Sequence, residues 1–258
     1  MKFKRNSPSG KQRGFSLLEL LLVIAILSLI VGAVFSQMGD AQRRLNAEET
    51  KLGDFQEARD FVDQFFRDIN QAGTPNIRMY DPTQTFSPAL TTPYTNDSRF
   101  AVGLVSIDNN SITFEGSVNG NGTVQSVTYM INGSGGTTCP LCLQRSQIDK
   151  QNGNPVTGQK TPDWGTEIND ITNNTTTFPI FRYYQYDGTQ ITIPTGGIDI
   201  TTNAATIANV KTIQINLTIR NPKIIDQKTG LPIETSFEGE VSLNNCSMAS
   251  VGQQMSCQ

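Results

Sequence analysis

Histidine is absent from this chain of 258 residues. Histidine is the side chain that most often acts as a general base near neutral pH, and it is the commonest metal ligand, so its absence excludes Ser-His-Asp and Cys-His catalytic arrangements. No glycine-rich phosphate loop opens a helix either, because Gly116–Gly122 lies between two expected strands and is typical of a hairpin loop. The sequence therefore predicts that the protein is not an enzyme.

Charged residues are scarce, at 17% of the chain, and they are unevenly placed. Five basic residues and no acidic residue precede Phe15. Without residues 1–14 the chain would hold 15 basic and 23 acidic residues, a formal net charge of −8. Proteins bind nucleic acid through clustered Lys and Arg, so this acidic body is a poor candidate for that role.

Only four cysteines occur: Cys139, Cys142, Cys246 and Cys257. An even number in an exported chain favours two disulfides, and four cysteines allow three pairings. Pairing of sequence neighbours would join Cys139 to Cys142 and Cys246 to Cys257. The Cys139–Cys142 spacing also fits half of a zinc site, but the other two cysteines are ten residues apart and do not fit it. A four-cysteine zinc site and free or redox-active thiols are the alternatives.

Residues 20–35 form an uncharged apolar run, LLLVIAILSLIVGAVF, in which only Ser28 is polar. As a helix this run would span about 24 Å, and residues 15–18 bring it close to the length that a bilayer requires. The basic residues ahead of it predict that the N-terminus stays in the cytoplasm and that the rest lies outside. Glu19, at the edge of the run, is costly, since an unpaired charge at membrane depth costs about 2.5–3.5 kcal/mol or more.

Three interpretations of this segment compete. It could be a secretory signal cleaved near Val31-Gly32-Ala33, an uncleaved anchor, or a leader cleaved between Gly14 and Phe15. Glu19 favours the third interpretation. A helix that begins at Phe15 has a new α-amino group, and Glu19 then lies in its first turns, where the helix dipole favours negative charge. The carboxylate can also meet the amine of a neighbouring copy in lipid.

The segment Arg13-Gly14-Phe15-Ser16-Leu17-Leu18-Glu19, followed by an apolar run, resembles the class III signal of type IV pilins and pseudopilins. The resemblance implies that a prepilin peptidase cleaves after Gly14 and methylates the amine of Phe15. It also implies that Glu19 pairs with the N-terminal amine of an adjacent subunit during filament assembly. The implied partners are other major and minor pilins and assembly platform proteins. The implied location is the bacterial inner membrane, single-pass with the head in the periplasm, and later a cell-surface or periplasmic filament.

A polar but periodic segment follows the apolar run. Its apolar residues are spaced by seven, three, seven, four and three, which predicts one stripe on an amphipathic helix: Leu45, Leu52, Phe55, Val62, Phe66 and Ile69, widened by Phe61 and Phe65. Gly73-Thr74-Pro75 is a helix stop. We therefore expect a cleaved leader (1–14), a membrane or filament-core helix (15–36) and an amphipathic half-helix (37–73). No proline occurs between Phe15 and Thr74, unlike in many major pilins, so we do not expect details of major-pilin filament packing to transfer.

Residues 74–258 are rich in Gly, Asn, Thr and Ser and contain short strand-like runs. The expected strands are 100–107, 111–114, 124–131, 141–145, 181–186, 190–193, 210–220 and 237–243. The odd positions from 213 to 219 form one apolar face. Residues 74–98 and 133–177 are expected to be loops, and Trp164 to anchor the second loop to the core. We expect an α+β class, with an antiparallel β-sheet head packed on the helix stripe, as in the pilin fold.

Three segments of the head, FRYYQYDG (181–188), VKTIQINLTIR (210–220) and FEGEVSLNN (237–245), resemble the larger minor pilins of the PilW type and the J-type pseudopilins of type II secretion. The resemblance implies a minor pilin at or near a filament tip, which initiates assembly and supports adhesion, motility or DNA uptake. The alternative is a J-type minor pseudopilin, and the second alternative is a membrane-anchored binding module. No cofactor is expected, with calcium at Asn169-Asp170 or Asp108–Asn110 kept as an alternative, since some J-type relatives bind calcium.

Overall fold

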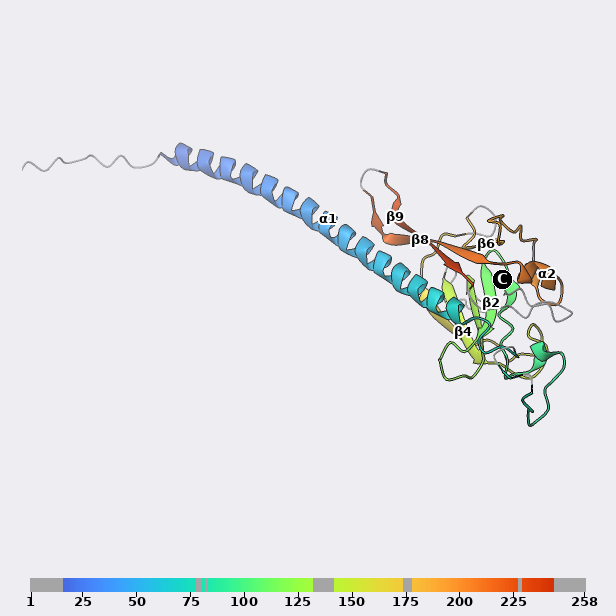
Figure 1. Cartoon of the computed structure of the whole chain (residues 1–258). Helices are drawn as coiled ribbons and strands as arrows, with labels where there is room; N and C mark the ends of the chain where they lie inside the picture. The colour runs from blue at the N-terminus through green and yellow to red at the C-terminus, as the bar shows by residue number, and fades with distance from the viewer. Residues whose placement is uncertain are drawn as a thin grey trace, which may run out of the picture. The chain divides into compact units, whose positions relative to one another are not determined.

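The computed structural model describes residues 16–77, 80–81, 83–131, 142–173, 178–226 and 229–243. Its first element is helix α1, Leu17–Gln71 (Figure 1). The chain divides into two compact units, Met1–Thr50 and Lys51–Gln258. The described part of the first unit consists of α1 residues and Ser16, whereas the second unit holds the rest of α1 and every described strand.

The two ends of α1 follow from local sequence. Proline is absent from its interior, and proline is the residue that most disfavours a helix. At the start, the carbonyl oxygen of Ser16 accepts hydrogen bonds from the backbone N–H groups of Glu19 (3.0 Å) and Leu20 (3.2 Å). Just past the end, Gly73 has a φ of 77°, a left-handed conformation that glycine adopts without strain. The helix stop predicted at Gly73-Thr74-Pro75 is confirmed.

The larger sheet of the second unit has six antiparallel strands in the order β5-β4-β3-β2-β1-β7. The bounds are β1 Leu104–Ile107, β2 Ser111–Gly116, β3 Gln125–Ile131, β4 Leu143–Asp149, β5 Trp164–Ile168 and β7 Ile198–Asp199. Strands β1 to β4 are joined in chain order as neighbours, and β2 pairs with β3 from Ser111↔Met130 to Gly116↔Gln125. Residues Asp108–Asn110 join β1 to β2, and the predicted hairpin loop at Gly116–Gly122 lies between β2 and β3, with Gly116 itself the last residue of β2.

A second sheet has three antiparallel strands in the order β6-β8-β9. They are β6 Phe181–Tyr184, β8 Thr212–Ile225 and β9 Pro232–Ser242, and β8 and β9 form a long hairpin (Figure 1). The predicted apolar face of β8 is confirmed, because Ile213, Ile215, Leu217 and Ile219 are all buried. The described residues of this unit also include two short helical elements, the 3-10 turn η2 at Tyr94–Asn96 and helix α2 at Ala204–Ala208.

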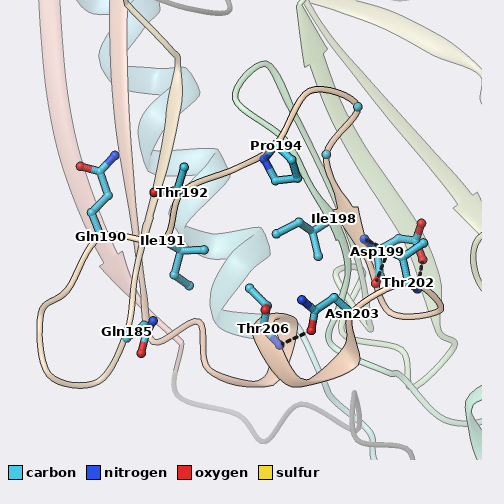
Figure 2. A pocket seen from close by; sticks show the side chains of 12 residues that line it. Gln185, Gln190, Ile191, Thr192, Pro194, Ile198, Asp199, Thr202, Asn203 and Thr206 are labelled. Atoms are coloured by element: carbon cyan, nitrogen blue, oxygen red, sulfur yellow. Dashed lines mark hydrogen bonds between the residues drawn. The ribbon is translucent and has the colours of Figure 1, made fainter.

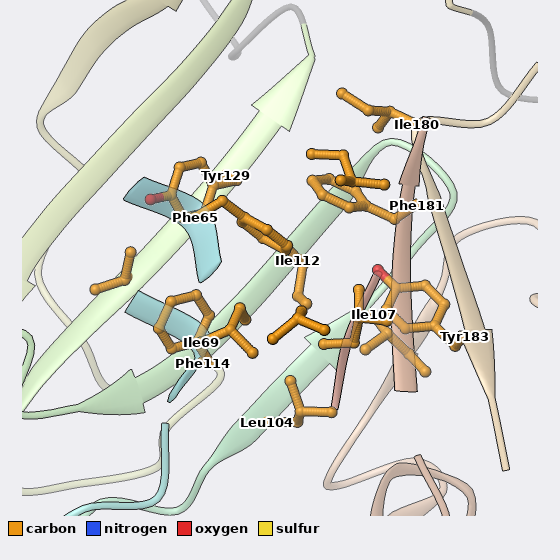
Figure 3. Close-up of a cluster of buried hydrophobic side chains, with 14 of the residues drawn as sticks. Phe65, Ile69, Leu104, Ile107, Ile112, Phe114, Tyr129, Ile180, Phe181 and Tyr183 are labelled. Carbon is orange, nitrogen blue, oxygen red and sulfur yellow. The ribbon is translucent and has the colours of Figure 1, made fainter. Parts of the chain in front are cut away.

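The core of the second unit lies where α1 meets both sheets (Figure 3). Phe65 of α1 is fully buried, and its ring centroid lies 5.2 Å from that of Tyr129 in β3 and 5.5 Å from that of Phe181 in β6. One side chain thus touches both sheets. The expectation of an α+β protein with a long N-terminal helix and antiparallel sheets is confirmed.

The apolar stripe predicted along α1 is confirmed towards the end of the helix, where Val62 and Ile69 are buried, but not at Leu52. In the second unit, Leu52 is 60% exposed, whereas Ala58, Phe61, Val62, Phe65 and Ile69 are buried. A helix turns by about 100° per residue, so Leu52 lies about 180° around the axis from Phe61. Phe61 and Phe65, predicted at the margin of the stripe, lie at the centre of the buried face.

Two predictions about the strands are also wrong. Residues 133–177 were expected to be loop, yet β5 starts at Trp164 and forms an edge of the six-stranded sheet. Trp164 is partly buried there and pairs with Ser146 of β4. Residues 190–193 were expected to be a strand, but only an isolated bridge joins Gln190 to Tyr184. The apolar character of Ile191 reflects burial against the core in an irregular segment, which apolar pattern alone does not distinguish from a strand.

Candidate functional site

The N-terminal part of α1 presents a long apolar surface. Large apolar side chains from Leu17 to Met38 are all exposed, between 41% for Val31 and 77% for Leu17. Among the described residues, α1 is the one helix that is long and apolar enough to cross a membrane. Soluble monomers rarely expose apolar patches of more than a few hundred Å², so this surface needs lipid or other helices around it.

Glu19 interrupts this surface close to its N-terminal end. It lies in the first turn of α1, where unpaired backbone N–H groups and the helix dipole favour a negative charge. Gly14 and Phe15, the predicted cleavage pair, lie outside the described residues. Cleavage between them, methylation of Phe15 and the assembly role of Glu19 therefore stay predictions.

Residues 9–35 match the prokaryotic N-terminal methylation motif. This prepilin-type signal and the long apolar helix that carries it support a type IV pilin-like protein. The signal implies processing by a prepilin peptidase and assembly with other pilins, and it suggests a structural protein. The apolar helix fits membrane anchoring before assembly. Neither the curated proteins nor the solved structures yield a match to the chain.

A fully buried ion pair lies in the second unit, between β2 and the end of β4. The Lys150 ammonium donates hydrogen bonds to the Glu115 carboxylate (2.6 Å) and to the carbonyl oxygens of Thr95 and Phe100 (both 2.8 Å). Both side chains are 0% exposed. Burial raises the pKa of Glu115 and lowers the pKa of Lys150, while their mutual attraction opposes both shifts. The pair ties the η2 loop to the six-stranded sheet.

Close to this pair, Asp97 fixes the same loop from the other side. Its carboxylate accepts hydrogen bonds from Arg99 Nη2 (2.7 Å) and from the backbone N–H of Thr91 (2.9 Å). The hydrogen bond from Arg99 outweighs burial and holds the pKa of Asp97 at about 2. The guanidinium of Arg99 also lies over the Phe86 ring, 5.4 Å from its centroid. These contacts stabilise residues 86–100 as an ordered segment.

A second polar cluster joins α1 to the six-stranded sheet. Asp68 of α1 accepts hydrogen bonds from Tyr129 Oη (2.7 Å) and from Arg145 Nη2 (2.7 Å) and Nε (3.0 Å). Burial raises the pKa of Tyr129, so the phenol remains a proton donor. Every group in this cluster is engaged with its neighbours, which is typical of a structural network in a low-dielectric interior.

A cavity of about 550 Å³ lies between the segment after β6, strand β7 and helix α2 (Figure 2). Its side chains are mostly neutral, and several are already engaged within the fold. Asn203 caps α2 by accepting from Thr206 N–H, and Asp199 accepts from the N–H groups of Thr201 and Thr202. Burial raises the pKa of Asp199, but these hydrogen bonds together hold it below its usual value. Asp199 is the one ionisable residue of the lining, so the cavity has no acid–base pair.

The two loops kept as alternative calcium sites make contacts within the fold. Asp108 Oδ1 accepts from Asn109 N–H, and the Asp170 carbonyl oxygen accepts from Arg220 N–H. The described part of the chain holds no group of three or more His, Cys, Asp or Glu placed to bind a metal. Calcium at these loops stays an untested alternative to the expectation of no cofactor.

Two tyrosines of β6, Tyr183 and Tyr184, make contacts within the fold. Tyr183 is fully buried and donates its hydroxyl to the carbonyl oxygen of Asp108 (2.9 Å). Tyr184 lies on the opposite face of β6 and donates to Gln214 Oε1 (2.9 Å). Tyr186 lies in the turn that follows β6 and is 74% exposed.

The cysteines lie mostly outside the described residues. Cys142, just before β4, is fully buried and takes part in a disulfide. Cys139, Cys246 and Cys257 lie outside the described ranges. Which cysteine pairs with which, and the existence of a second disulfide, stay predictions.

Sequence reasoning found the signal segment but missed the buried polar groups of the second unit. Glu115 and Lys150 are 35 positions apart, and Asp68 and Arg145 are 77 apart. Glu115 gave no clear signal, since it directly follows the expected strand 111–114, where a charged residue is ordinary. Without strand register, the sequence does not reveal which cation lies opposite.

Proposed function

We propose that this chain is a minor pilin, a structural subunit that is built into a type IV pilus at or near the tip, initiates assembly and supports adhesion, motility or DNA uptake. The observation that carries the proposal is the N-terminal methylation motif over residues 9–35, on a helix whose large apolar side chains from Leu17 to Met38 are all exposed. In the proposed route the peptidase cleaves between Gly14 and Phe15, and Phe15 is then methylated. Glu19 pairs with the N-terminal amine of a neighbouring subunit, which offsets the cost of a carboxylate in lipid.

The head supports a minor subunit rather than the abundant shaft subunit. The three segments that resemble larger minor pilins are not scattered, because they form one antiparallel sheet, β6-β8-β9, packed on α1. Shaft subunits are usually shorter than this chain. The second candidate is a J-type minor pseudopilin of a type II secretion system, which the same sheet supports equally, and a membrane-anchored binding module is the third.

The first test is the N-terminus of the mature protein. The protein is purified from its native membrane, its intact mass is measured and its N-terminus is sequenced. We expect a chain that starts at N-methyl-Phe15 and is lighter by residues 1–14. A chain that starts at Met1 or near Val34 would contradict the proposal and favour an anchored or secreted binding module. Detection of the mature chain in sheared surface filaments would separate the pilus from the secretion system.

A further inference from the structure

The cavity between the segment after β6, strand β7 and helix α2 is lined almost entirely by neutral side chains. Its volume of about 550 Å³ lies within the range of pockets that bind small molecules. Among the described residues, the lining contains no lysine or arginine, and Asp199 is its one ionisable residue. A phosphate, sulfate or carboxylate group in this cavity would therefore meet no cation and would be repelled by Asp199. These charges favour a neutral ligand.

Several polar groups of this lining have no partner within the described ranges. The side-chain amides of Gln185 and Gln190 and the hydroxyl of Thr192 form no hydrogen bond there. Asn203 Oδ1 accepts a hydrogen bond from the backbone N–H of Thr206 (3.1 Å), which leaves Asn203 Nδ2 as a donor. A side-chain amide has two N–H donors and a carbonyl acceptor, and a hydroxyl both donates and accepts. The cavity therefore offers donors and acceptors together, as a ligand rich in hydroxyl groups requires.

Asp199 supplies the strongest acceptor of the lining. Its Oδ1 accepts from the backbone N–H groups of Thr201 (2.7 Å) and Thr202 (2.9 Å), whereas no described residue donates to its Oδ2. Burial raises the pKa of Asp199, but these hydrogen bonds together hold it below its usual value, so the carboxyl group is ionised near neutral pH. A hydroxyl group that donates to an ionised oxygen forms a stronger hydrogen bond than one that donates to a neutral oxygen.

A small apolar surface lies among these polar groups. Ile191 and Ile198 of the lining are 6% and 8% exposed, and Pro194 lies beside them in the lining. Figure 2 shows the two isoleucines between Gln190 on one side and Asp199 on the other. A sugar ring has C–H groups on its faces and hydroxyl groups around its edge. An apolar surface with hydrogen-bonding groups around it therefore matches the two kinds of surface that a sugar ring presents.

The turn on one side of the cavity is fixed to the six-stranded sheet. Gly197 has a φ of 77°, and its N–H donates to the Pro194 carbonyl oxygen (3.0 Å). A Cβ atom on Gly197 would lie 2.9 Å from the carbonyl oxygen of Ile107 in β1, and the next residue, Ile198, pairs with Ile107. A site held in this way loses less conformational entropy on binding than a flexible loop does.

We propose that this cavity binds one sugar residue of a neutral saccharide. Ile191 and Ile198 contact a face of the ring, while Gln185, Gln190 and the free oxygen of Asp199 form hydrogen bonds with its hydroxyl groups. A peptide segment is the weaker candidate, because an extended backbone is bound along an unpaired strand edge rather than in a pocket of side-chain amides. The inference goes beyond the proposed function, since it assigns a ligand to the second unit whether the chain enters a pilus, a secretion filament or neither.

The direct test is saturation-transfer NMR and titration of the full-length chain in a detergent without a sugar headgroup. The probes are the trimers of glucose, galactose, mannose and N-acetylglucosamine, with a sialylated trisaccharide and the trimer of galacturonic acid as acidic counterparts. We expect at least one neutral trimer to bind with a Kd of about 1 mM or tighter. The acidic trimers should bind at least about tenfold more weakly, because they meet Asp199 and no cation. Saturable binding of no neutral trimer, preference for an acidic trimer, or binding only of a neutral Ser- and Thr-rich peptide would overturn the proposal.

A second measurement places the bound saccharide in this cavity. Gln185→Ala with Gln190→Ala removes two amides that no described residue contacts, and Gln56→Ala with Gln84→Ala removes two exposed amides elsewhere as the matched control. We expect the cavity variant to bind the best neutral trimer at least about fivefold more weakly than the wild type, and the control variant to bind it as the wild type does. Asp199→Asn, which keeps the shape of the side chain, should also weaken binding. Equal affinity in the wild type and the cavity variant would reject the site.

The outcomes separate this inference from the proposed function. A mature chain that starts at N-methyl-Phe15 and binds no neutral saccharide would reject the inference alone. A chain that starts at Met1 and binds a neutral saccharide through Gln185 and Gln190 would reject the proposed function and leave the inference intact.

Discussion

At the scale of single residues, the second unit contains an ion pair that is fully buried from solvent. Lys150 and Glu115 are both 0% exposed, and the ammonium places one hydrogen on the carboxylate and the others on two backbone carbonyls. A buried pair of this kind adds little net stability compared with an apolar pair, but removal of one partner leaves an uncompensated charge in a dry interior. The pair therefore favours one position of the η2 loop, even though it adds little to the free energy of unfolding compared with an apolar pair.

Replacement of Lys150 alone should destabilise the protein strongly. We expect Lys150→Met to lower the free energy of unfolding by about 3–5 kcal/mol, because Glu115 would be left buried and unpaired. The double variant Glu115→Gln with Lys150→Met should lose less free energy of unfolding, since no unpaired charge remains buried. Unfolding in guanidinium of the full-length chain in detergent, followed by the fluorescence of Trp164, measures both.

The exposed Lys160 provides the matched control for that experiment. Lys160→Met should change the free energy of unfolding by no more than about 0.5 kcal/mol, because its ammonium is solvated. If Lys150→Met proved as mild as Lys160→Met, the ion pair would not hold the loop.

At the scale of elements, the junction between α1 and the six-stranded sheet is close enough to exclude a side chain. The last turn of α1 crosses β2, with a bridge between Ala72 and Gly116 and a hydrogen bond from Gly73 N–H to the Glu115 carbonyl oxygen (2.8 Å). A Cβ atom on Gly116 would overlap the carbonyl oxygen of Gln71 and lie 2.8 Å from its carbonyl carbon. Backbone atoms cannot move away as a flexible side chain does, so the glycine sets the distance between helix and sheet.

Gly116→Ala should therefore be costly despite the small change in volume. We expect it to lower the free energy of unfolding by about 1–3 kcal/mol, because α1 must shift from β2 to make room. Gly165→Ala in β5 is the control, since its Cβ would lie 3.8 Å from the nearest atom, the Arg145 carbonyl oxygen. Unfolding midpoints of the two variants in guanidinium test this; equal loss in both would refute the steric explanation.

At the scale of the whole molecule, the two units meet different requirements. The second unit buries its own apolar residues between α1 and two sheets, whereas the described part of the first unit buries none. The exposed apolar side chains of the first unit therefore need an apolar environment that the described part of this chain does not supply. Together with the prepilin-type signal, this division fits membrane anchoring before assembly.

Glu19 provides a test of that division. We expect Glu19→Ala to be cleaved and methylated like the wild type but to be at least about tenfold depleted from sheared filaments, since the amine of the neighbouring subunit loses its counter-charge. Mass spectrometry of the N-terminus and immunoblots of the filament and membrane fractions measure the two steps separately. Asp40→Ala, an exposed acid of the same unit, should leave both steps unchanged. Normal incorporation of Glu19→Ala would contradict the assembly role.

The sequence by itself determined the features that depend on neighbouring residues. The signal over residues 9–35, the end of α1 before Gly73, and the alternation that buries Ile213, Ile215, Leu217 and Ile219 could all be predicted, because each follows from contiguous residues and local backbone geometry. The antiparallel arrangement of the head also followed from short strands separated by turns.

Only the tertiary structure decided which distant residues meet. It placed Trp164 at the edge of a sheet rather than in a loop, joined Glu115 to Lys150, and divided the apolar residues of α1 into a buried face and an exposed one. In the sequence, a leucine on the exposed face of α1 cannot be distinguished from one on the buried face. The difference arises because burial depends on what the rest of the chain packs against a given side of the helix, and no local pattern contains that information.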